Sequence, residues 1–505
     1  MFWESSVKPV ARCFAAAILA IIVVAGAGCG SSSSSNSRVN LVPTFPPATV
    51  PLIKLSTDPF TNATSSHATE VEPDSFSFGS TIVAAFQVGR IAGGGSSDIG
   101  FAVSTDAGAS WQNGFLPGLT TFQGGGPNTA VSDPAVVYDA RHAVWLISSL
   151  TIASNSATQV VVNSSPDGMN WNNPAAVSAQ SLPPNPDKGW IVCDNTANSP
   201  FYGHCYVEWD DFPGNSVFMS TSTDGGVNWS VPKNTTGFAT GIGGQPLVQL
   251  DGTVVVPYLD LSPAIRAFTS TDGGASWTSP VLVGAVQLHQ VAGGLRNDPL
   301  PSAQIDATGN IYVVWQDCSF RAGCSSYDLV MSTSADGTTW TAPARIPIDP
   351  VSSTVDHFIP GIGVDPLTSG STAHLGLTYY YYPQANCSTA TCALFVGFIS
   401  SLDGGSTWSA ATPVAGPMSL SWLAPTSQGP MVGDYIATSF AGGKAYGVFA
   451  VAKQNAGSTF DEAIYTTQAG FNVAVMAARN SSAGEKPLVN AISPSIQIQA
   501  ARRIR

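Results

Sequence analysis

The stretch Ser270-Thr271-Asp272-Gly273-Gly274-Ala275-Ser276-Trp277 decides the fold, because close copies of it recur along the chain. Three further copies, at residues 104–111, 222–229 and 401–408, keep the same spacing of Ser, Asp, Gly and Trp. Two more, at 164–171 and 333–340, place the Asp directly before the Gly. The tryptophans that end the copies are 48 to 68 residues apart. A fixed element at such a period indicates a repeat architecture.

The chemistry of each copy is typical of a hairpin. An apolar run comes before it, as in residues 99–103 ahead of Ser104, so we expect a strand to enter the motif. The Asp carboxylate can accept backbone N–H bonds within a turn, and Gly adopts the positive φ that a side chain resists. We expect the Trp to begin the return strand and to place a large apolar ring between neighbouring units.

The pattern S-x-D-x-G-x-x-W resembles the Asp-box (BNR) repeat of the sialidase superfamily, whose members are β-propellers. The resemblance implies an all-β fold of four-stranded blades. It also implies that the Asp box is a structural turn away from the ligand site, so its residues are assigned no chemistry.

The composition agrees with many short strands and turns. The 505 residues include 50 Gly and 36 Pro, and only 10% of them are charged. Acidic residues outnumber basic ones by 32 to 19, and the pI is about 4.7. Because no basic patch is present to neutralise phosphates, nucleic acid is excluded as a partner.

Residues 1–29 have the features of a lipoprotein-type signal peptide. Lys8 and Arg12 precede an apolar run at 13–25, and Gly26-Ala27-Gly28-Cys29 resembles a bacterial lipobox, although Gly26 stands where that motif usually has Leu. Two alternatives follow: lipidation of Cys29, which anchors the chain to a membrane, or plain cleavage and secretion. In both cases the chain is exported, with residues 30–48 as a Ser/Pro-rich tether.

Six further cysteines form three close pairs, and an even number in an exported chain predicts disulfides. Metal binding is the alternative, but no Cys-x-x-Cys motif or His cluster accompanies them. The predicted pairs are Cys193 with Cys205, Cys318 with Cys324, and Cys387 with Cys392.

Residues 49–478 are predicted to form one propeller in which each unit has three strands, an Asp box and a fourth strand. The segments 433–437, 445–450 and 463–466 predict a seventh unit that has no Asp box. An orphan apolar segment, Val50 to Leu55, is expected to supply its fourth strand and to close the ring, because an open edge invites aggregation. Seven blades are therefore favoured, six being the alternative, with 479–505 as a loose tail.

In propellers, ligands bind over the central channel, on the face formed by loops that enter the first strands and by loops between the second and third strands. Any single charged residue on these loops could instead cap a turn. A ligand site is indicated only because many of these residues are expected on the same face. On the entering loops lie Asp133, Asp187, Lys188, Arg296, Asp298, Asp356, His357 and Asp434. On the other loops lie Arg90, Asp210, Asp211, Asp260, Asp317 and Arg321.

The resemblance to sialidases implies three arginines that bind a substrate carboxylate, a Tyr nucleophile with a Glu beside it, and an Asp acid/base. Arg90, Arg296 and Arg321 are the candidate arginines, Tyr435 the candidate nucleophile and Asp133 the candidate acid/base. The chain departs from the family pattern, because Gly89-Arg90-Ile91-Ala92 lacks the Pro of the Arg-Ile-Pro motif. Asp434 also points to the opposite strand face from Tyr435.

Two functions follow. One is a monomeric propeller at the cell surface whose loop residues Asp187, Lys188, Asp298, His357 and Asp434 bind a glycan or a protein. The alternative is an exo-acting, sialidase-like glycoside hydrolase. No cofactor is required, although the Asp-rich face is compatible with Ca²⁺, which prefers several oxygen ligands.

Overall fold

The computed structural model describes residues 45–154, 156–177, 185–473, 479–480 and 487. The chain divides into two compact parts after Pro43, and everything below concerns the second part. The predicted signal peptide, Cys29 and most of the tether lie outside the described residues. None of the described helices is long and apolar enough to cross a membrane.

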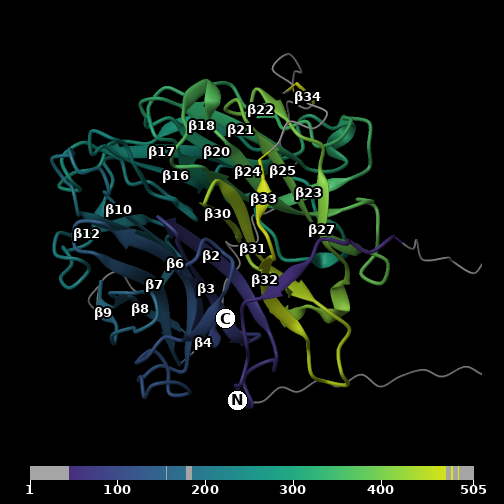
Figure 1. The fold of residues 1–505 in the computed structure, drawn as a ribbon, viewed down its shortest axis with the longest axis horizontal. Coiled ribbons are helices and arrows are strands. Elements are labelled where there is room, and N and C mark those ends of the chain that lie inside the picture. Colours follow the sequence, from purple (N-terminus) through teal and green to yellow (C-terminus); the bar gives the residue numbers. More distant parts are fainter. Residues whose placement is uncertain (1–44, 155, 178–184, 474–478, 481–486, 488–505) are drawn as a thin grey trace, which may run out of the picture. The chain divides into compact units, whose positions relative to one another are not determined.

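The described chain is all-β, as predicted, and its antiparallel strands follow one another in sequence order (Figure 1). We number the units of antiparallel strands 1 to 7 along the chain; units 4 and 7 have five strands and the others have four. Units 1 and 2 join in one eight-stranded sheet, because Ser96 pairs with Val131. Unit 1 contains β2 (Glu70–Phe78), β3 (Thr81–Arg90), β4 (Ser96–Ser104) and β5 (Gln112–Phe115). Unit 2 contains β6 (Ala130–Asp139), β7 (Val144–Ala153), β8 (Ser156–Ser165) and β9 (Ala175–Ala176). Unit 3 contains β10 (Pro186–Cys193), β11 (Cys205–Asp211), β12 (Val217–Ser222) and β13 (Lys233–Asn234).

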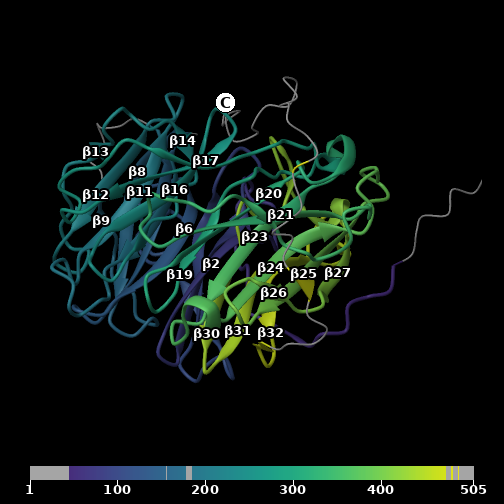
Figure 2. The same cartoon turned by 90° about the horizontal axis from the view of Figure 1, so that it is seen from above.

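The next three units repeat this order. Unit 4 contains β14 (Gly241–Ile242), β15 (Leu247–Val248), β16 (Val254–Asp260), β17 (Ala264–Ser270) and β18 (Val281–Ala285). Unit 5 contains β19 (Ser302–Ile305), β20 (Ile311–Asp317), β21 (Asp328–Ser334) and β22 (Ala344–Arg345). Unit 6 contains β23 (Asp356–Val364), β24 (Leu375–Tyr382), β25 (Ala393–Ser401) and β27 (Thr412–Ser419). Figure 2 shows β23, β24 and β25 side by side.

Unit 7 combines both ends of the described chain. It contains β30 (Ala437–Ala441), β31 (Lys444–Ala452), β32 (Glu462–Thr467) and β1 (Leu52–Lys54), with β33 (Phe471–Asn472) also paired to β31. In the register of β1 and β32, Ile53 lies opposite Thr466. The first strand begins later than the predicted segment 433–437, because Asp434 contacts charged side chains of other units instead of joining a ladder.

Two short ladders lie outside the units. β28 (Ala424–Thr426) and β29 (Gly429–Met431) form a hairpin, and β26 (Thr407–Trp408) pairs with β34 (Arg479–Asn480). The predicted tail therefore begins with two paired residues. Four 3-10 turns complete the described elements: Ala292–Gly294, Ala322–Cys324, Gly370–Thr372 and Leu420–Trp422.

The core consists of apolar layers between successive sheets. Strands such as β4 and β23 are buried along their whole length, without alternation, because each sheet packs against a neighbour on both faces. Val137 of unit 2 packs with Trp209 of unit 3, for example, and Val255 of unit 4 packs with Val313 of unit 5. Burial of these layers is the main stabilising contribution to the fold.

The Asp boxes are closed turns, as predicted. In the copy of unit 4, the Ser270 hydroxyl donates to Asp272 Oδ1 (2.8 Å), which also accepts the Ser276 N–H (2.9 Å). Gly274 has φ +84°, and a Cβ there would lie 2.2 Å from Thr221 Oγ1. In unit 1 the fourth strand begins at Gln112, directly after Trp111, whereas in units 2 to 6 it begins four residues after the Trp and not at it as predicted. In four copies, including that of Trp408, the indole N–H donates back to a Gly carbonyl and holds the ring within the turn.

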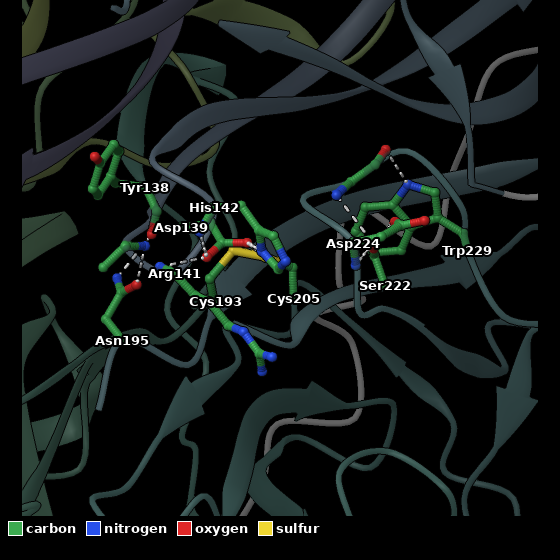
Figure 3. Close-up of a disulfide and its surroundings, with 12 residues drawn as sticks. Tyr138, Asp139, Arg141, His142, Cys193, Asn195, Cys205, Ser222, Asp224 and Trp229 are labelled. Atoms are coloured by element: carbon green, nitrogen blue, oxygen red, sulfur yellow. Dashed lines mark hydrogen bonds and ion pairs between the residues drawn. A yellow bond between two sulfur atoms is a disulfide. The ribbon is translucent and has the colours of Figure 1, made fainter. Parts of the chain in front are cut away.

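The three predicted disulfides are present: Cys193–Cys205, Cys318–Cys324 and Cys387–Cys392. Figure 3 shows the first of them beside Asp139, whose carboxylate lies 2.6 Å from His142 Nδ1. Each bridge lies within one unit or in the loops that follow its second strand.

Candidate functional site

The candidate site lies at one end of the strands, where the first strand of each unit begins. In unit 1, Arg90 ends β3 and pairs with Ser96, whereas Ile82, at the other end of β3, pairs with Ser104 of the Asp box. The Asp boxes and the site are therefore at opposite ends of the strands, as the resemblance implies.

β-Bulges turn charged residues out of the first strands of units 1, 2 and 3. The ladders are interrupted at Glu72, Asp133 and Lys188, which have φ values of +58°, +49° and +47°. A non-glycine residue in this left-handed region is strained, and a bulge re-aims its side chain away from the ladder. The strain is compensated by the contacts that the three side chains make with one another.

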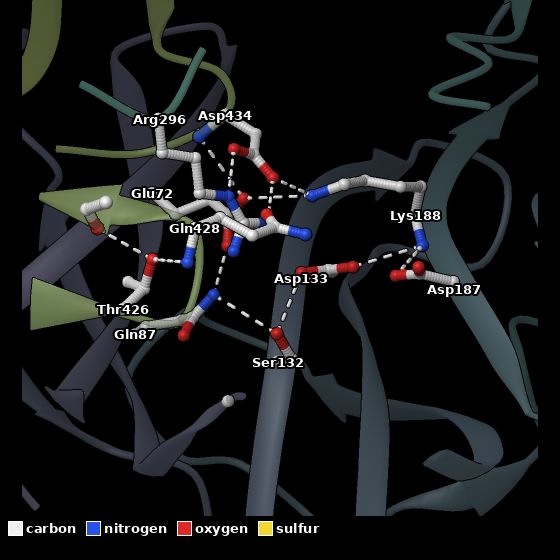
Figure 4. Close-up of polar contacts among 12 residues, drawn as sticks. Glu72, Gln87, Ser132, Asp133, Asp187, Lys188, Arg296, Thr426, Gln428 and Asp434 are labelled. Atoms are coloured by element: carbon white, nitrogen blue, oxygen red, sulfur yellow. Dashed lines mark hydrogen bonds and ion pairs between the residues drawn. The ribbon is translucent and has the colours of Figure 1, made fainter. Parts of the chain in front are cut away.

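Lys188 lies at the centre of these contacts (Figure 4). Its ammonium lies 3.5 Å from Glu72 Oε1 and also contacts Asp434 Oδ2. The guanidinium of Arg296 binds the same Asp434 carboxylate through two nitrogens. Its Nε donates to Oδ1 (2.8 Å), and its Nη2 donates to Oδ2. One carboxylate of unit 7 is therefore shared by cations from unit 3 and from the segment between units 4 and 5.

A second set of hydrogen bonds joins units 1, 2 and 3. The Gln87 amide donates to Glu72 Oε2 and to the Ser132 hydroxyl (3.2 Å). Ser132 in turn donates to Asp133 Oδ1 (2.8 Å), and the backbone N–H of Lys188 donates to Asp133 Oδ2 (3.0 Å). We call Glu72, Asp133, Lys188, Arg296 and Asp434, together with Arg90, the charged cluster.

The cluster is buried, and its environment separates the acidities of its carboxyl groups. Burial raises the pKa of Glu72 to about 7, although Lys188 opposes the shift. Burial alone would raise the pKa of Asp133, but the positive charge of Lys188 outweighs it and lowers that pKa below its usual range. For Asp434, Arg296 and Lys188 together outweigh burial and lower the pKa in the same way. Burial and the nearby Arg296 lower the pKa of Arg90 to about 10. Three cations thus face three acidic groups, one of which titrates near neutral pH.

A small cavity of about 30 Å³ lies beside the cluster. Its walls include Arg90, Lys188, Arg296 and Asp187 together with the glycine turn 93–95, and Ser427 and Gln428 of the β28–β29 hairpin also line it. The hairpin is attached by the Ser427 N–H, which donates to the Ala92 carbonyl (3.0 Å), and by the Arg296 N–H, which donates to the Pro430 carbonyl (2.9 Å). The cavity has room for about two water molecules.

Two predicted site residues lie in a different cluster. The Arg321 guanidinium pairs with Asp328 and Asp349, and its side chain is 1% exposed. His357 packs edge-on against Tyr379, and burial lowers the pKa of its imidazole. The three candidate arginines therefore do not surround one ligand carboxylate, because Arg321 is held by carboxylates of its own unit and of the loop that follows it.

Tyr435 has a structural environment. Its hydroxyl donates to the Pro134 carbonyl (2.9 Å), its ring meets Trp190 edge-on at 4.9 Å, and burial raises the pKa of the phenol well above its usual value. A phenol held neutral in this way is a poor nucleophile. Asp187 lines the cavity, whereas Asp298 is buried ahead of β19 and does not line it.

Glu72, Gln87 and Ser132 are the site residues that sequence reasoning missed. A signal for Glu72 was present, because Glu72-Pro73 stands at the same place in its unit as Asp133-Pro134 in the next. Aligning the units on these acid–proline pairs, instead of on the Asp boxes, would have identified it. Gln87 is an ordinary strand residue in the sequence and carries no such signal.

Asp328, Asp349 and His357 form a group that could hold a metal ion, because their ligand atoms lie within 4.8 Å of one another. The group does not fit Ca²⁺, because Arg321 pairs with both carboxylates and Ca²⁺ prefers oxygen ligands. Binding of Ca²⁺ elsewhere on the acidic face stays a prediction.

No protein-family model matches the chain, and no curated protein matches it. Among solved structures, it resembles a protein of unknown function from Dyadobacter fermentans, with 14% identity, 70% of this chain and 99% of that chain covered, and a TM-score of 0.43. It also resembles the NanB sialidase of Streptococcus pneumoniae (13% identity, 86% and 72% covered, TM-score 0.38). A third neighbour is the α-L-arabinanase of Penicillium chrysogenum (13% identity, 67% and 93% covered, TM-score 0.39). Sialidases are thus among the structural neighbours, but likeness at this level carries no argument about activity.

Proposed function

We propose that the chain is an exported Asp-box β-propeller of seven blades, which binds a glycan at the charged cluster over its central channel. The first strands support the seven-bladed ring: β2 contacts β6, β6 contacts β10, β10 contacts β15, and the series continues through β19, β23 and β30 back to β2. The pairing of β1 with β32 joins the two ends of the chain within one sheet.

The binding function is supported by one observation: the side chains of the charged cluster come from several units that are far apart in the sequence. These side chains come from units 1, 2, 3 and 7 and from the segment before unit 5, yet they contact one another at the end of the strands that is opposite to the Asp boxes. One cavity is lined by four of them: Arg90, Asp133, Lys188 and Arg296. Charged groups held in fixed positions are strong hydrogen-bond partners for sugar hydroxyls. Rigid sheets that present polar groups in loops are a common way to build a binding site.

A glycan panel followed by calorimetry tests this function. The purified chain is expected to bind at least one glycan, and Lys188→Met is expected to weaken the affinity by at least about tenfold, because it removes the central cation. Lys233→Met is the matched control, since Lys233 contacts carbonyls beside the Asp box of unit 4, away from the cluster. Absence of binding to every glycan, or equal loss in the control, would contradict the proposal.

Glycoside hydrolysis is the second candidate function, and the divergent acidities of the cluster favour it. A carboxylic acid that keeps its proton near neutral pH can protonate a leaving-group oxygen, while an ionised carboxylate activates water or attacks the sugar. Glu72 has the first property, and Asp133, which lines the cavity, has the second. The contacts of Arg321 and Tyr435 make a sialidase mechanism the less supported version.

Chromogenic aryl glycosides and a fluorogenic sialoside distinguish hydrolysis from binding. If the chain hydrolyses a neutral glycoside, Glu72→Gln should reduce kcat by at least about 100-fold. The rate should also fall as pH rises through about 7, because Glu72 then loses its proton. Asp106→Asn, at an Asp box, is the control and should keep full activity. Turnover that survives Glu72→Gln would exclude the assignment.

Export and lipidation at Cys29 form part of the same proposal. The three disulfides are consistent with an oxidising, extracytoplasmic location. Metabolic labelling with a radioactive fatty acid should label the chain, and Cys29→Ser should abolish the label and release the protein into the medium. A labelled Cys29→Ser variant would show that another residue is the anchor.

A further inference from the structure

Asp434 makes the contacts that a bound carboxylate would make. Its two oxygens receive the Nε and Nη2 atoms of Arg296 side by side, and its Oδ2 also contacts the Lys188 ammonium. This paired geometry is the one in which a guanidinium recognises a carboxylate ligand. The carboxylate in this position belongs to the protein itself.

The position leaves the two cations with little capacity for another anion. The side chains of Asp434, Lys188 and Arg296 are 1%, 3% and 14% exposed, so solvent screens their ion pairs weakly. Arg296 and Lys188 line the cavity, whereas Asp434 does not. A ligand in the cavity therefore meets two cations whose positive charge is already neutralised by the Asp434 carboxylate.

Other acidic groups do not replace this compensation. Glu72 Oε1 lies 3.5 Å from the Lys188 ammonium, and it also accepts the Asp434 N–H (3.3 Å). Asp133 is held by Ser132 and by the Lys188 backbone. Glu72 and Asp133 raise the pKa of Arg296 through their charge, whereas Asp434 also binds it directly, so loss of the Asp434 carboxylate would leave the guanidinium without these two hydrogen bonds.

We infer that Asp434 is a specificity-determining residue, which occupies the carboxylate position of the site and thereby restricts it to uncharged ligands. That these ligands are glycans rests on the function proposed above, whereas the anion exclusion rests on the ion pairs alone. The expected ligand class is a neutral sugar, and acidic sugars such as sialic or uronic acids are excluded by charge.

Replacing the internal carboxylate with an added one tests the inference. Asp434→Ala is expected to have a lower Tm than the unaltered chain, because two buried cations lose their partner. Sodium formate or acetate should then raise the Tm of this variant by a few degrees through binding in the vacated position, and sodium chloride at the same ionic strength should not. The unaltered chain should show no difference between the salts.

Asp187→Ala is the matched control, because Asp187 lines the same cavity and its carboxylate accepts the Lys188 backbone N–H. Its Tm should not depend on formate or acetate. An Asp434→Ala variant that folds and does not respond to either anion would overturn the inference, and so would an equal response of the control. If Asp434→Ala fails to fold, refolding yield in acetate against chloride gives the same comparison.

A matched pair of sugars gives a second, independent measurement. The unaltered chain should bind methyl glucoside-type ligands at least about tenfold more tightly than the corresponding glucuronides, and Asp434→Asn should reduce or reverse this preference. Equal binding of both sugars by the unaltered chain would contradict the inference. If the chain binds no glycan at all, the proposed function fails, but the formate and acetate experiment still decides the role of Asp434.

Discussion

Lys188 joins three units through two different parts of one residue. Its backbone N–H binds Asp133 of unit 2, and its ammonium binds Glu72 of unit 1 and Asp434 of unit 7. The left-handed φ of +47° makes both contacts possible at once, because it turns the residue out of the β10 ladder. The backbone conformation of Lys188 is therefore as important for these contacts as its positive charge.

At the same scale, Tyr435→Phe separates a structural role from a catalytic one. The substitution removes the buried hydrogen bond to the Pro134 carbonyl and should lower the free energy of unfolding by about 1 kcal/mol, while glycan binding or hydrolysis persists. Chemical denaturation and the binding assay measure the two effects. Loss of turnover without loss of stability would instead favour a Tyr nucleophile.

Buried carboxyl groups make the stability depend on pH near neutrality. Burial raises the pKa of Asp74 from its usual value of 3.8 to about 7, although Val136 N–H donates to it. Above pH 4 the unfolded chain releases this proton and the folded chain keeps it, so stability falls as pH rises from about 4 to 7. Asp74→Asn should reduce this loss of Tm, which a pH series of thermal unfolding measures.

Asp106→Asn is the control for this pH dependence. Hydrogen bonds from Ser110 lower the pKa of Asp106 to about 2. The contribution of Asp106 is therefore present above pH 4 and is lost only as pH falls toward 2. A pH profile between 4 and 7 that changes equally in both variants would contradict the assignment to Asp74.

At the scale of elements, the β28–β29 hairpin forms part of the cavity wall. Because the hairpin and the glycine turn 93–95 both line the cavity, we expect one of them to move when a glycan binds. Local opening of a short hairpin costs less free energy than opening a whole unit. Ser427, in the turn between β28 and β29, donates a 3.0 Å backbone hydrogen bond to the Ala92 carbonyl.

Locking the hairpin should therefore block binding. With Ala92→Cys and Ser427→Cys combined, the oxidised variant should lose at least about tenfold in glycan affinity, and reduction should restore it. Calorimetry under oxidising and mildly reducing conditions makes the comparison, with each single cysteine variant as the control. Full affinity in the locked form would place the ligand outside the cavity.

At the scale of the whole molecule, β1 joins the beginning of the described chain to the sheet of unit 7. It covers the edge of β32, and the Leu55 N–H adds a bond to the Ile464 carbonyl (2.8 Å). A chain that begins at Ser56 should expose this edge, unfold at lower temperature and associate through it. A chain that begins at Phe45 retains β1 and is the control. Light scattering measures the association, and thermal unfolding measures the Tm. Equal association and equal Tm of the two chains would show that β1 is not needed.

Much of this fold could be predicted from local sequence. The Asp boxes and the apolar runs before them depend on residues close together in the chain, because each turn forms its hydrogen bonds within about five residues. The disulfide pairs were predictable for the same reason, since each links cysteines close in sequence. The unpaired segment near Val50 and the seventh unit without a box predicted the pairing of β1 with β32.

Tertiary structure alone decided which charges meet. Arg90, Arg296 and Arg321 are equivalent in sequence as loop arginines, yet only the first two line the cavity, because Arg321 is bound by Asp328 and Asp349. Likewise, nothing local in the sequence predicts that Asp434 neutralises Arg296, 138 residues away. Hydrogen bonds within a turn depend on neighbouring residues, whereas ion pairs across the channel depend on how the sheets are placed around it.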